Sequence, residues 1–397
     1  MKSMKIAIVW EGVYAGGVDS YLSYLLNYWP VNDEFVLYYN SENQGVARLQ
    51  DLLEYRRIRF VPVPTVIRYF DASSPLLMIK KLMVHIFLPL LFIVNVLSYR
   101  RLFLRSKPDV VMCQNGGYPG SYAVTSAVFG AFLAGVKKNT MIIHHRANAP
   151  RFGHAFFRYY IEYFFSKISG RIIAISEATK TTILDETHFY QGDSDHIVVI
   201  PNGVPDAENK RLKLPKSNCP LRIGTIGRLD PHKGHEDLLE AVASLSVEIK
   251  QNLTISFIGS YSPEDYERVH RKINEFRLSE IVTICGFVNK PINEILLNLD
   301  LLAMTTKDFE GFGLTVVEAL NTGIPVLATS VGIVPELLGA KYPLAVRPGD
   351  VEAITVAIET YFELDEKISI ITPEIRRNLQ KYDPKNVSTS YREHLVG

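Results

Sequence analysis

The sequence predicts an α/β protein built from two doubly wound domains, and three observations lead to this class. Short apolar runs recur from Lys5 onward, each ending in Gly, Asn, Ser or His and followed by a longer stretch with helical spacing. The runs are continuous in Val, Ile and Leu rather than alternating, which is typical of parallel strands buried on both faces. A polar segment without apolar periodicity, residues 201–220, separates two series of such runs.

The apolar runs give the expected strands in order. In the first series they are residues 5–9, 35–39, 58–63, 109–113, 140–145, 171–175 and 196–200; in the second they are 221–226, 253–258, 281–285, 299–304 and 325–329. The expected domains are therefore 1–205 and 206–375. A helical C-terminal segment, 376–397, is in a position to return to the first domain.

Composition excludes several classes of protein. A chain of 397 residues that is 47% hydrophobic can form two or three domains, each with its own core. The net charge of +1 provides no field for polyanions, so nucleic acid is not an expected partner. Three widely spaced cysteines support neither a disulfide framework nor a zinc site. The first apolar run is too short for a signal peptide, so we expect a cytoplasmic protein.

Residues 82–97 interrupt the pattern of strands and helices. The segment is almost entirely apolar, yet it is shorter than the ~20 residues of a spanning helix and contains Pro89 and Asn95. Its basic neighbours are Lys80, Lys81, Arg100, Arg101, Arg105 and Lys107. This pattern favours a helix lying on an anionic membrane surface; a helix buried in the first domain is the alternative, and a spanning helix is least favoured.

Loops that follow strands are where a parallel α/β sheet binds its ligands. After the first strand, Gly16 and Gly17 precede an expected helix whose N-terminal amides suit an anion. After the first strand of the second domain, Arg228 and Lys233 lie on either side of a turn, and two such cations suit a diphosphate. The alternatives are a purely structural glycine turn and a solvated basic turn.

Residues 307–329 are the most informative stretch. Glu310 ends a loop, Gly311 and Gly313 free the backbone after it, a helix is expected from Leu314, and Glu318 lies more than one turn into that helix. A carboxylate accepts two hydroxyl groups at once, so Glu318 suits a ribose and Glu310 suits a second sugar. The alternative is a loop acid followed by a solvated acid on the helix surface.

In this order along the chain, the motifs resemble the retaining nucleotide-sugar glycosyltransferases of family 4, within the glycosyl transferases of group 1. The resemblance rests on Gly-Gly-Val at 16–18, Gly227-Arg228 with Lys233-Gly234, Glu310-Gly-Phe-Gly-Leu through Glu318, His144-His145, SEATK at 176–180, PNGV at 201–204 and CGFV at 285–288. It implies the GT-B fold, in which two Rossmann-like domains close on a nucleotide-sugar. The acceptor would bind the N-terminal domain and the donor the C-terminal one.

The resemblance also implies roles for residues of this chain. Arg228 and Lys233 would hold the donor diphosphate, and Glu318 would bind the ribose. The other implied donor contacts are Gly16 and Gly17 at the phosphates, Gly286, Phe287 and Val288 at the base, and Glu310, Gly311, Phe312, Gly313 and Leu314 at the sugar. One segment departs from the family pattern: where members often have Gly-Gly-x-x-Glu, this chain has Gly332-Ile333-Val334-Pro335-Glu336.

The first domain supplies the residues expected near the reacting centre. His144 matches a family histidine and is followed by His145; side chains alternate along a strand, so only one of them can face the cleft, and we expect it to be His144. A hydrogen-bonded structural histidine is the alternative. The candidates for acceptor contact are Asp19, His145, Arg146 and Asn148.

The resemblance implies a reaction without a metal or other cofactor, since the basic pair neutralises the leaving diphosphate. The implied route is a same-face substitution in which the nucleotide-sugar is a co-substrate. We expect UDP as the nucleotide first and GDP second. If residues 82–97 contact a membrane, a lipid-linked saccharide in cell-surface polysaccharide assembly is the expected acceptor. A nucleotide-sugar 2-epimerase and a non-catalytic nucleotide-sugar-binding protein remain the rival functions.

Overall fold

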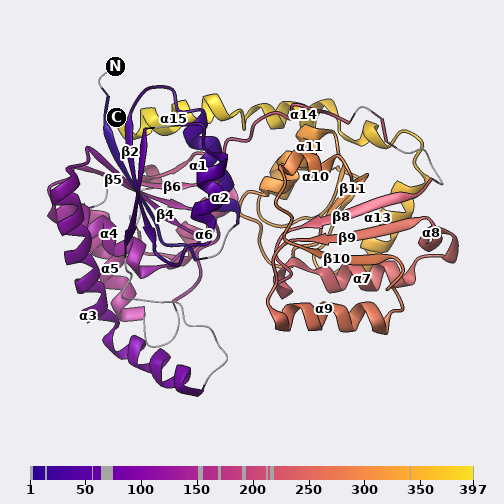
Figure 1. Ribbon diagram of the computed structural model, residues 1–397, viewed down its shortest axis with the longest axis horizontal. Coiled ribbons are helices and arrows are strands. Elements are labelled where there is room, and N and C mark those ends of the chain that lie inside the picture. Colours follow the sequence, from indigo (N-terminus) through magenta and orange to yellow (C-terminus); the bar gives the residue numbers. More distant parts are fainter. Residues whose placement is uncertain are drawn as a thin grey trace. The chain divides into compact units, whose positions relative to one another are not determined.

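The computed structural model describes residues 3–13, 16–55, 57–63, 75–150, 155–168, 171–189, 194–211, 213–214, 219–339 and 341–396. The chain divides into two units, one comprising Met1–Gly203 with Pro384–Gly397 and the other Val204–Asp383. Each unit is a parallel sheet with helices on its faces, which is the α/β class that the sequence predicts (Figure 1).

The first unit is a seven-stranded sheet in the order β3-β2-β1-β4-β5-β6-β7. Its strands are β1 (Lys5–Trp10), β2 (Glu34–Asn40), β3 (Ile58–Val63), β4 (Val110–Asn115), β5 (Lys138–Ile143), β6 (Arg171–Ala174) and β7 (Ile197–Val199). Its helices are α1 (Gly17–Asn27), α2 (Gly45–Leu52), α3 (Pro75–Ser106), α4 (Tyr122–Leu133), α5 (Ala155–Ile168), α6 (Glu177–Glu186) and α15 (Pro384–Val396). Every neighbouring pair of strands is parallel.

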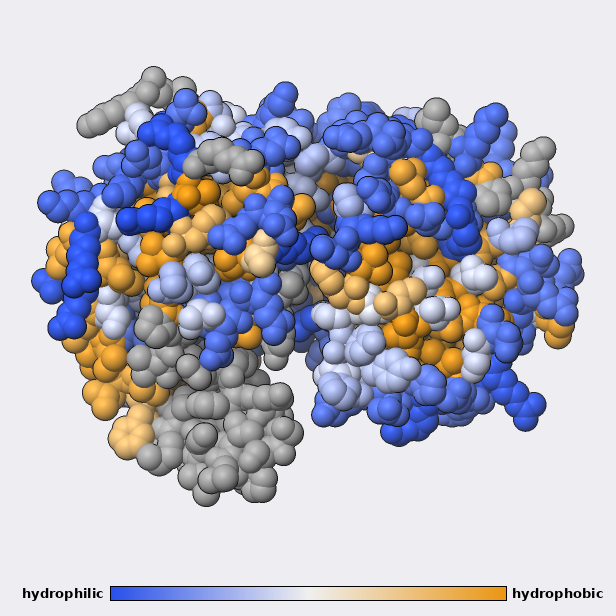
Figure 2. Space-filling model, in the orientation of Figure 1, coloured by the Kyte–Doolittle hydropathy of each residue, from blue (hydrophilic) through white to orange (hydrophobic). Residues whose placement is uncertain are grey.

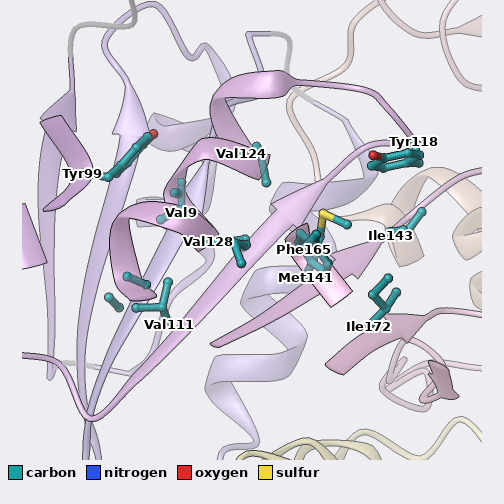
Figure 3. Packing of buried hydrophobic residues seen from close by; sticks show 14 of the residues in the cluster. Val9, Tyr99, Val111, Tyr118, Val124, Val128, Met141, Ile143, Phe165 and Ile172 are labelled. Atoms are coloured by element: carbon teal, nitrogen blue, oxygen red, sulfur yellow. The ribbon is translucent and has the colours of Figure 1, made fainter. Parts of the chain in front are cut away.

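One face of this sheet is covered by α3, α4, α5 and α6. Strand side chains such as Val9, Val111 and Met141 belong to the same buried cluster as Tyr99 of α3 and Phe165 of α5 (Figure 3). Burial on both faces explains why the strand runs are apolar without alternation.

The second unit is a six-stranded parallel sheet in the order β10-β9-β8-β11-β12-β13. Its strands are β8 (Leu221–Ile226), β9 (Leu253–Ile258), β10 (Val282–Gly286), β11 (Leu301–Met304), β12 (Val326–Thr329) and β13 (Ala345–Val346). Its α-helices are α7 (His235–Ser244), α8 (Val247–Gln251), α9 (Pro263–Glu275), α10 (Ile292–Leu296), α11 (Leu314–Thr322), α12 (Val334–Leu338), α13 (Val351–Glu363) and α14 (Pro373–Gln380). The sequence did not indicate β13, because two residues are too few to form an apolar run.

Each sheet reverses its strand order once. In the first unit the reversal lies between β1 and β4, and in the second it lies between β8 and β11. The loops at the carboxyl ends of these strands diverge to opposite faces, which opens a crevice where ligands of α/β sheets bind. The motifs singled out in the sequence lie at the carboxyl ends of β1, β5, β6, β7, β8, β10 and β11.

The end of the chain differs from the expected boundary. We expected the returning segment to begin at residue 376, but α14 belongs to the second unit and the first unit resumes only at Pro384. Helix α14 packs on α12, so its first residues are held in the second unit. Helix α15 then packs on α1, where Ser388 Oγ donates to the Leu25 carbonyl at 3.0 Å.

The apolar segment expected at 82–97 is part of one longer helix, α3, which includes Pro89. Residues Phe87–Ser106 are long and apolar enough to cross a membrane by length and composition, with a mean hydropathy of 1.5, and 33% of that window is buried. Helix α3 therefore covers the sheet with one side only, and the buried-helix interpretation accounts for only part of its apolar surface.

Candidate active site

The glycine turn after β1 leads directly into α1. The helix begins at Gly17, with Gly16 as its N-cap, and Tyr14 and Ala15 lie outside the described residues. A Cβ added at Gly16 would meet nothing within 4 Å. The position of a Gly16 side chain is thus open, and the helix dipole favours an anion near the first amides of α1.

Asp19 lies beneath this turn rather than on its surface. The side chain is fully buried; Oδ2 accepts hydrogen bonds from the Gly16 amide at 3.3 Å and from Arg48 at 3.1 Å, and Oδ1 accepts one from the Ser20 amide at 2.8 Å. Burial raises the pKa of the Asp19 carboxyl above its usual value, although Arg48 opposes the shift. Asp19 is therefore placed to cap α1 and to hold the glycine turn. Its buried side chain does not support the expected contact with an acceptor.

His144 follows β5 and does not belong to it. The strand ends at Ile143, so the alternation along a strand that we used to choose between His144 and His145 does not apply. The His144 amide donates to the Asn115 carbonyl at 2.9 Å, and its ring lies edge-on to Tyr21 of α1 with centroids 4.7 Å apart. His144 is therefore held between the carboxyl ends of β4 and β5 and the first turns of α1.

Gln114 of β4 is hydrogen-bonded to the His144 ring, and no sequence pattern singled it out. His144 Nε2 lies 2.8 Å from Gln114 Oε1, and because an amide oxygen can only accept, the ring carries its proton on Nε2. Burial lowers the pKa of His144 to about 3. Within the described part of the chain, the buried Gln114 Nε2 has no hydrogen-bond acceptor.

We expect wild-type His144 to stay neutral as the pH falls from 8 to about 4, since its folded pKa is about 3. In Gln114→Glu a carboxylate would face Nε2 and raise this pKa, so the ring should become charged within that range. NMR titration of the ring nitrogens, assigned with His144→Asn, measures both states. Protonation of wild-type His144 near pH 6.5 would contradict the assignment.

The segment after His144 runs beside the loop that follows β4. The Tyr118 amide donates to the Arg146 carbonyl at 3.2 Å, and the Asn148 amide donates to the Tyr118 carbonyl at 2.9 Å. Arg158 of α5 donates to the Asn148 carbonyl and forms a buried ion pair with Glu162. The acceptor candidates His145, Arg146 and Asn148 thus lie together, on a loop fixed by backbone bonds.

The two cations of the second unit differ in their surroundings. Arg228 lies just after β8, is 55% exposed, and pairs with Asp230 at 3.2 Å. Lys233 ends the short helix Pro231–Lys233 before α7, and its Nζ lies 2.9 Å from Glu310 Oε2. The resemblance implied that Lys233 binds the diphosphate and Glu310 the donor sugar; in the structure these two side chains pair with each other.

Several contacts between the loops after β8 and β11 make this pair possible. The Lys307 amide donates to the His232 carbonyl at 2.8 Å, and His232 Nδ1 lies 2.7 Å from Asp308 Oδ2. Thr305 Oγ1 donates to the carbonyls of Lys233 and Gly234 at 3.1 and 2.9 Å. The two loops approach so closely that a Cβ at Gly234 would lie 1.9 Å from the Thr305 carbonyl oxygen.

Gly332 supports Glu310 from the other side. Its φ is +56°, and a Cβ added there would lie 1.8 Å from the Glu310 carbonyl oxygen. The same oxygen accepts a hydrogen bond from the Ile333 amide at 3.1 Å. Ile333, which replaces the second glycine of the family pattern, therefore uses its amide within the protein.

The loop after Glu310 leads into α11. Gly313 is the N-cap of α11 and Leu314 its first residue, as expected. The buried Phe312 ring packs on the Tyr382 ring, with the ring centroids 5.1 Å apart. Glu318 is 8% exposed. It is therefore not the solvated helix-surface acid of the alternative interpretation.

Of the residues expected at the base, Gly286 is the last residue of β10, and Phe287 and Val288 follow the strand. The Gly286 carbonyl accepts a hydrogen bond from the Gly259 amide at 2.9 Å, so this loop is fixed to the end of β9. Phe287 is 55% exposed, and Tyr261 lies 3.7 Å from the position of a Gly286 Cβ. Gly286, Phe287 and Val288 thus share the carboxyl edge of the sheet with the Lys233–Glu310 pair.

Metal ligands are not grouped in the part of the chain that the structure describes, where no cluster of three or more His, Cys, Asp or Glu side chains could hold an ion. One Asp-x-Asp sequence occurs, at Asp193-Ser194-Asp195, and Asp193 lies outside the described residues. Asp195 belongs to a short helix that precedes β7, so it lies at the amino edge of the sheet, opposite the edge of the ligand loops.

Two doubly wound units, with ligand loops at the carboxyl edge of each sheet, form the architecture that the GT-B resemblance implied. The model of Glycosyltransferase Family 4 matches residues 15–208, and that of Glycosyl transferases group 1 matches residues 206–385. The chain belongs to the group 1 glycosyltransferases.

Curated relatives match over part of their length. The MMP alpha-(1->4)-mannosyltransferase of Mycolicibacterium hassiacum is 28% identical over 191 residues, which are 47% of this chain and 44% of that protein. The putative colanic acid biosynthesis glycosyltransferase WcaL of Escherichia coli is 29% identical over 174 residues, 41% of each protein. The matched region is thus less than half of either relative.

Solved structures match over the whole chain. The Anabaena protein HepE, in complex with UDP and glucose, is similar with a TM-score of 0.76 at 19% identity, covering 99% of this chain and 100% of that one. This similarity confirms the GT-B fold that the sequence predicts.

Proposed function

We propose that this protein is a retaining glycosyltransferase that moves a sugar from a nucleotide-diphosphate sugar, with UDP as the nucleotide, to a lipid-linked saccharide in cell-surface polysaccharide assembly. The observation that carries the proposal is the Lys233–Glu310 pair at 2.9 Å, at the strand-order reversal of the second unit. It combines a cation for a diphosphate with a carboxylate for sugar hydroxyls. The side chains are 33% and 17% exposed, so a ligand can reach both.

The donor would be held by residues of the second unit. Arg228 and Lys233 would bind the diphosphate, and Glu310 with the amides of Gly311, Phe312 and Gly313 would bind the sugar. Glu318 would accept the ribose hydroxyls, and the loop of Gly286, Phe287 and Val288 would contact the base. In the first unit, Gly16 and Gly17 would present the first amides of α1 to phosphate.

The chemical step breaks the bond between the anomeric carbon and the diphosphate oxygen. The acceptor hydroxyl forms its new bond on the same face, and its proton passes to the departing diphosphate. Lys233 and Arg228 would neutralise the charge that develops there, as preorganised cations do.

His144 would assist without exchanging a proton. Its pKa of about 3 keeps it neutral, so it can orient a hydroxyl of donor or acceptor but cannot serve as a general acid near neutral pH. The loop of His145, Arg146 and Asn148 would contact the acceptor.

The names of similar proteins support the choice of substrates. HepE was solved with UDP and with glucose, and WcaL is described as a glycosyltransferase of colanic acid biosynthesis. Nucleotide-sugar use and a lipid-linked acceptor together favour a cytoplasmic enzyme at the inner face of the cell membrane.

The test of this function is product analysis. The protein is incubated with UDP- and GDP-sugars, with and without a lipid-linked saccharide fraction, and the glycan product is examined by mass spectrometry and NMR. We expect a glycosylated lipid with the donor's anomeric configuration. An epimerised nucleotide-sugar formed without acceptor would indicate the epimerase, and donor binding without turnover a binding protein.

Metal independence is a separate expectation. Because Lys233 and Arg228 supply the positive charge, activity should persist at the same rate in excess EDTA. Loss of turnover in EDTA that magnesium restores would overturn this part of the proposal.

A further inference from the structure

Helix α3 presents a stripe of large apolar side chains to solvent. On the described part of the helix these are Phe87, Leu90, Ile93, Val94, Leu97 and Leu104, each between 38% and 57% exposed. Figure 2 shows apolar side chains gathered along α3 at the lower left. An exposed apolar patch of this kind marks a surface that binds a partner or a membrane.

Helix α5 adds a second stripe that is aromatic. Its exposed members are Phe156, Tyr159, Tyr160, Tyr163 and Phe164, which recur at the spacing of one helix face. The two helices lie side by side: the Phe92 ring of α3 is 5.9 Å from Phe157 of α5, and Ile161 belongs to the same buried cluster as Phe92 and Val96. We call the two stripes together the α3–α5 face.

The charges beside this face are all of one sign. Among the described side chains of α3 and α5, the exposed charged ones are Arg100, Arg101, Arg105 and Lys167. The single acid, Glu162, is fully buried in its ion pair with Arg158. An apolar and aromatic face whose exposed charges on α3 and α5 are all basic, among the described residues, complements anionic headgroups over an acyl layer.

We propose that the α3–α5 face inserts into one leaflet of an anionic membrane. The three tyrosines suit the headgroup level, where a ring needs an apolar and a wet end. A second copy of the chain would bring like charges together, which disfavours a dimer through this face.

The insertion is shallow, and α3 does not span. Tyr99 and Phe103 of α3 are buried in the core of the first unit, and the Tyr99 hydroxyl is hydrogen-bonded to Glu11 just after β1. A spanning helix would have to leave the sheet and lose these contacts. Glu11 also ties the lipid-facing helix to the edge of the sheet that carries Gly16 and Gly17.

The experiment is vesicle sedimentation of the full chain at low salt, with phosphatidylglycerol in phosphatidylcholine or with phosphatidylcholine alone. The wild type should bind the anionic vesicles. The double variant Tyr160→Ser/Phe164→Ser should lower the partition coefficient by about tenfold or more. The control Leu184→Ser/Val356→Ser removes apolar side chains of matched exposure, 44% and 53% against 44% and 51%, from α6 and α13, and should bind as the wild type does.

The contribution of the basic side chains and the depth of insertion into the membrane are measured separately. Arg101→Gln/Arg105→Gln should weaken binding about fivefold per arginine and reduce its salt dependence. Tyr163→Trp should show blue-shifted fluorescence that lipids brominated on the acyl chain quench, because the native Trp10 and Trp29 are buried in the protein.

Three outcomes would overturn the proposal: no sedimentation with anionic vesicles, equal loss in the aromatic and control variants, or a chain that dimerises through this face and binds no lipid. The face does not depend on the transferase chemistry. Glu310→Ala should therefore bind vesicles normally, so failure of the proposed function and failure of lipid binding are separable.

Discussion

Lys233→Ala is expected to lower turnover by about 10²–10³-fold while the dissociation constant of the nucleotide-sugar changes much less. The lysine is held in place before the reaction by Glu310 and by Thr305, whose hydroxyl bonds the Lys233 carbonyl. Its charge matters most when negative charge develops on the departing diphosphate. Single-turnover and steady-state nucleotide release measure the split between kcat and binding.

Lys272→Ala is the matched control for this prediction. Lys272 also pairs with a carboxylate, at 3.0 Å from Glu275, and its side chain is 37% exposed, compared with 33% for Lys233. It lies on α9, away from the ligand loops, so the variant should keep turnover within about twofold. Unchanged turnover in Lys233→Ala, or an equal loss in the control, would refute the assigned role.

Gly332→Ala is expected to disturb the site through backbone packing alone. The new Cβ would lie 1.8 Å from the Glu310 carbonyl oxygen, and the φ of +56° is strained for alanine. The loop of Glu310 must move, so we expect most of the activity to be lost and the free energy of unfolding to fall by about 2 kcal/mol or more. Denaturant unfolding and nucleotide release measure the two effects.

Gly349→Ala is a control that introduces backbone strain without a steric clash of the new Cβ. Gly349 has a similar φ of +75°, but a Cβ there would meet nothing within 4 Å. This variant should lose only about 1 kcal/mol and keep its activity. Equal losses in the two variants would show that Gly332 does not support Glu310.

The sheets could be predicted from the sequence, because burial of parallel strands on both faces leaves continuous apolar runs. Each expected run forms a strand in the structure, within a few residues at its ends. The boundaries that the sequence predicted wrongly depend on packing between segments that are distant along the chain. The end of β5 at Ile143, before His144, and the place where the chain returns to the first unit at Pro384 leave no local pattern.

The candidate site was predictable in its residue types but not in its pairing. Loops after strands with glycine, cations and acids indicated the right segments, and Lys233, Glu310 and α11 do lie at one edge of one sheet. The Lys233–Glu310 contact joins residues that are 77 positions apart in the sequence, and local sequence spacing cannot predict a contact over such a separation. Gln114 and Thr305 were missed for the same reason, since each acts through a neighbouring strand.

Nucleotide release by the wild type and by Glu310→Ala tests the central claim most directly. Both are incubated with a panel of UDP-, GDP- and ADP-sugars, without acceptor and with a lipid-linked saccharide fraction. Release by the wild type from UDP-sugars, accelerated by the fraction and abolished in Glu310→Ala, is the predicted result. Equal release by the wild type and Glu310→Ala, or no release by the wild type from any donor under either condition, would contradict the account.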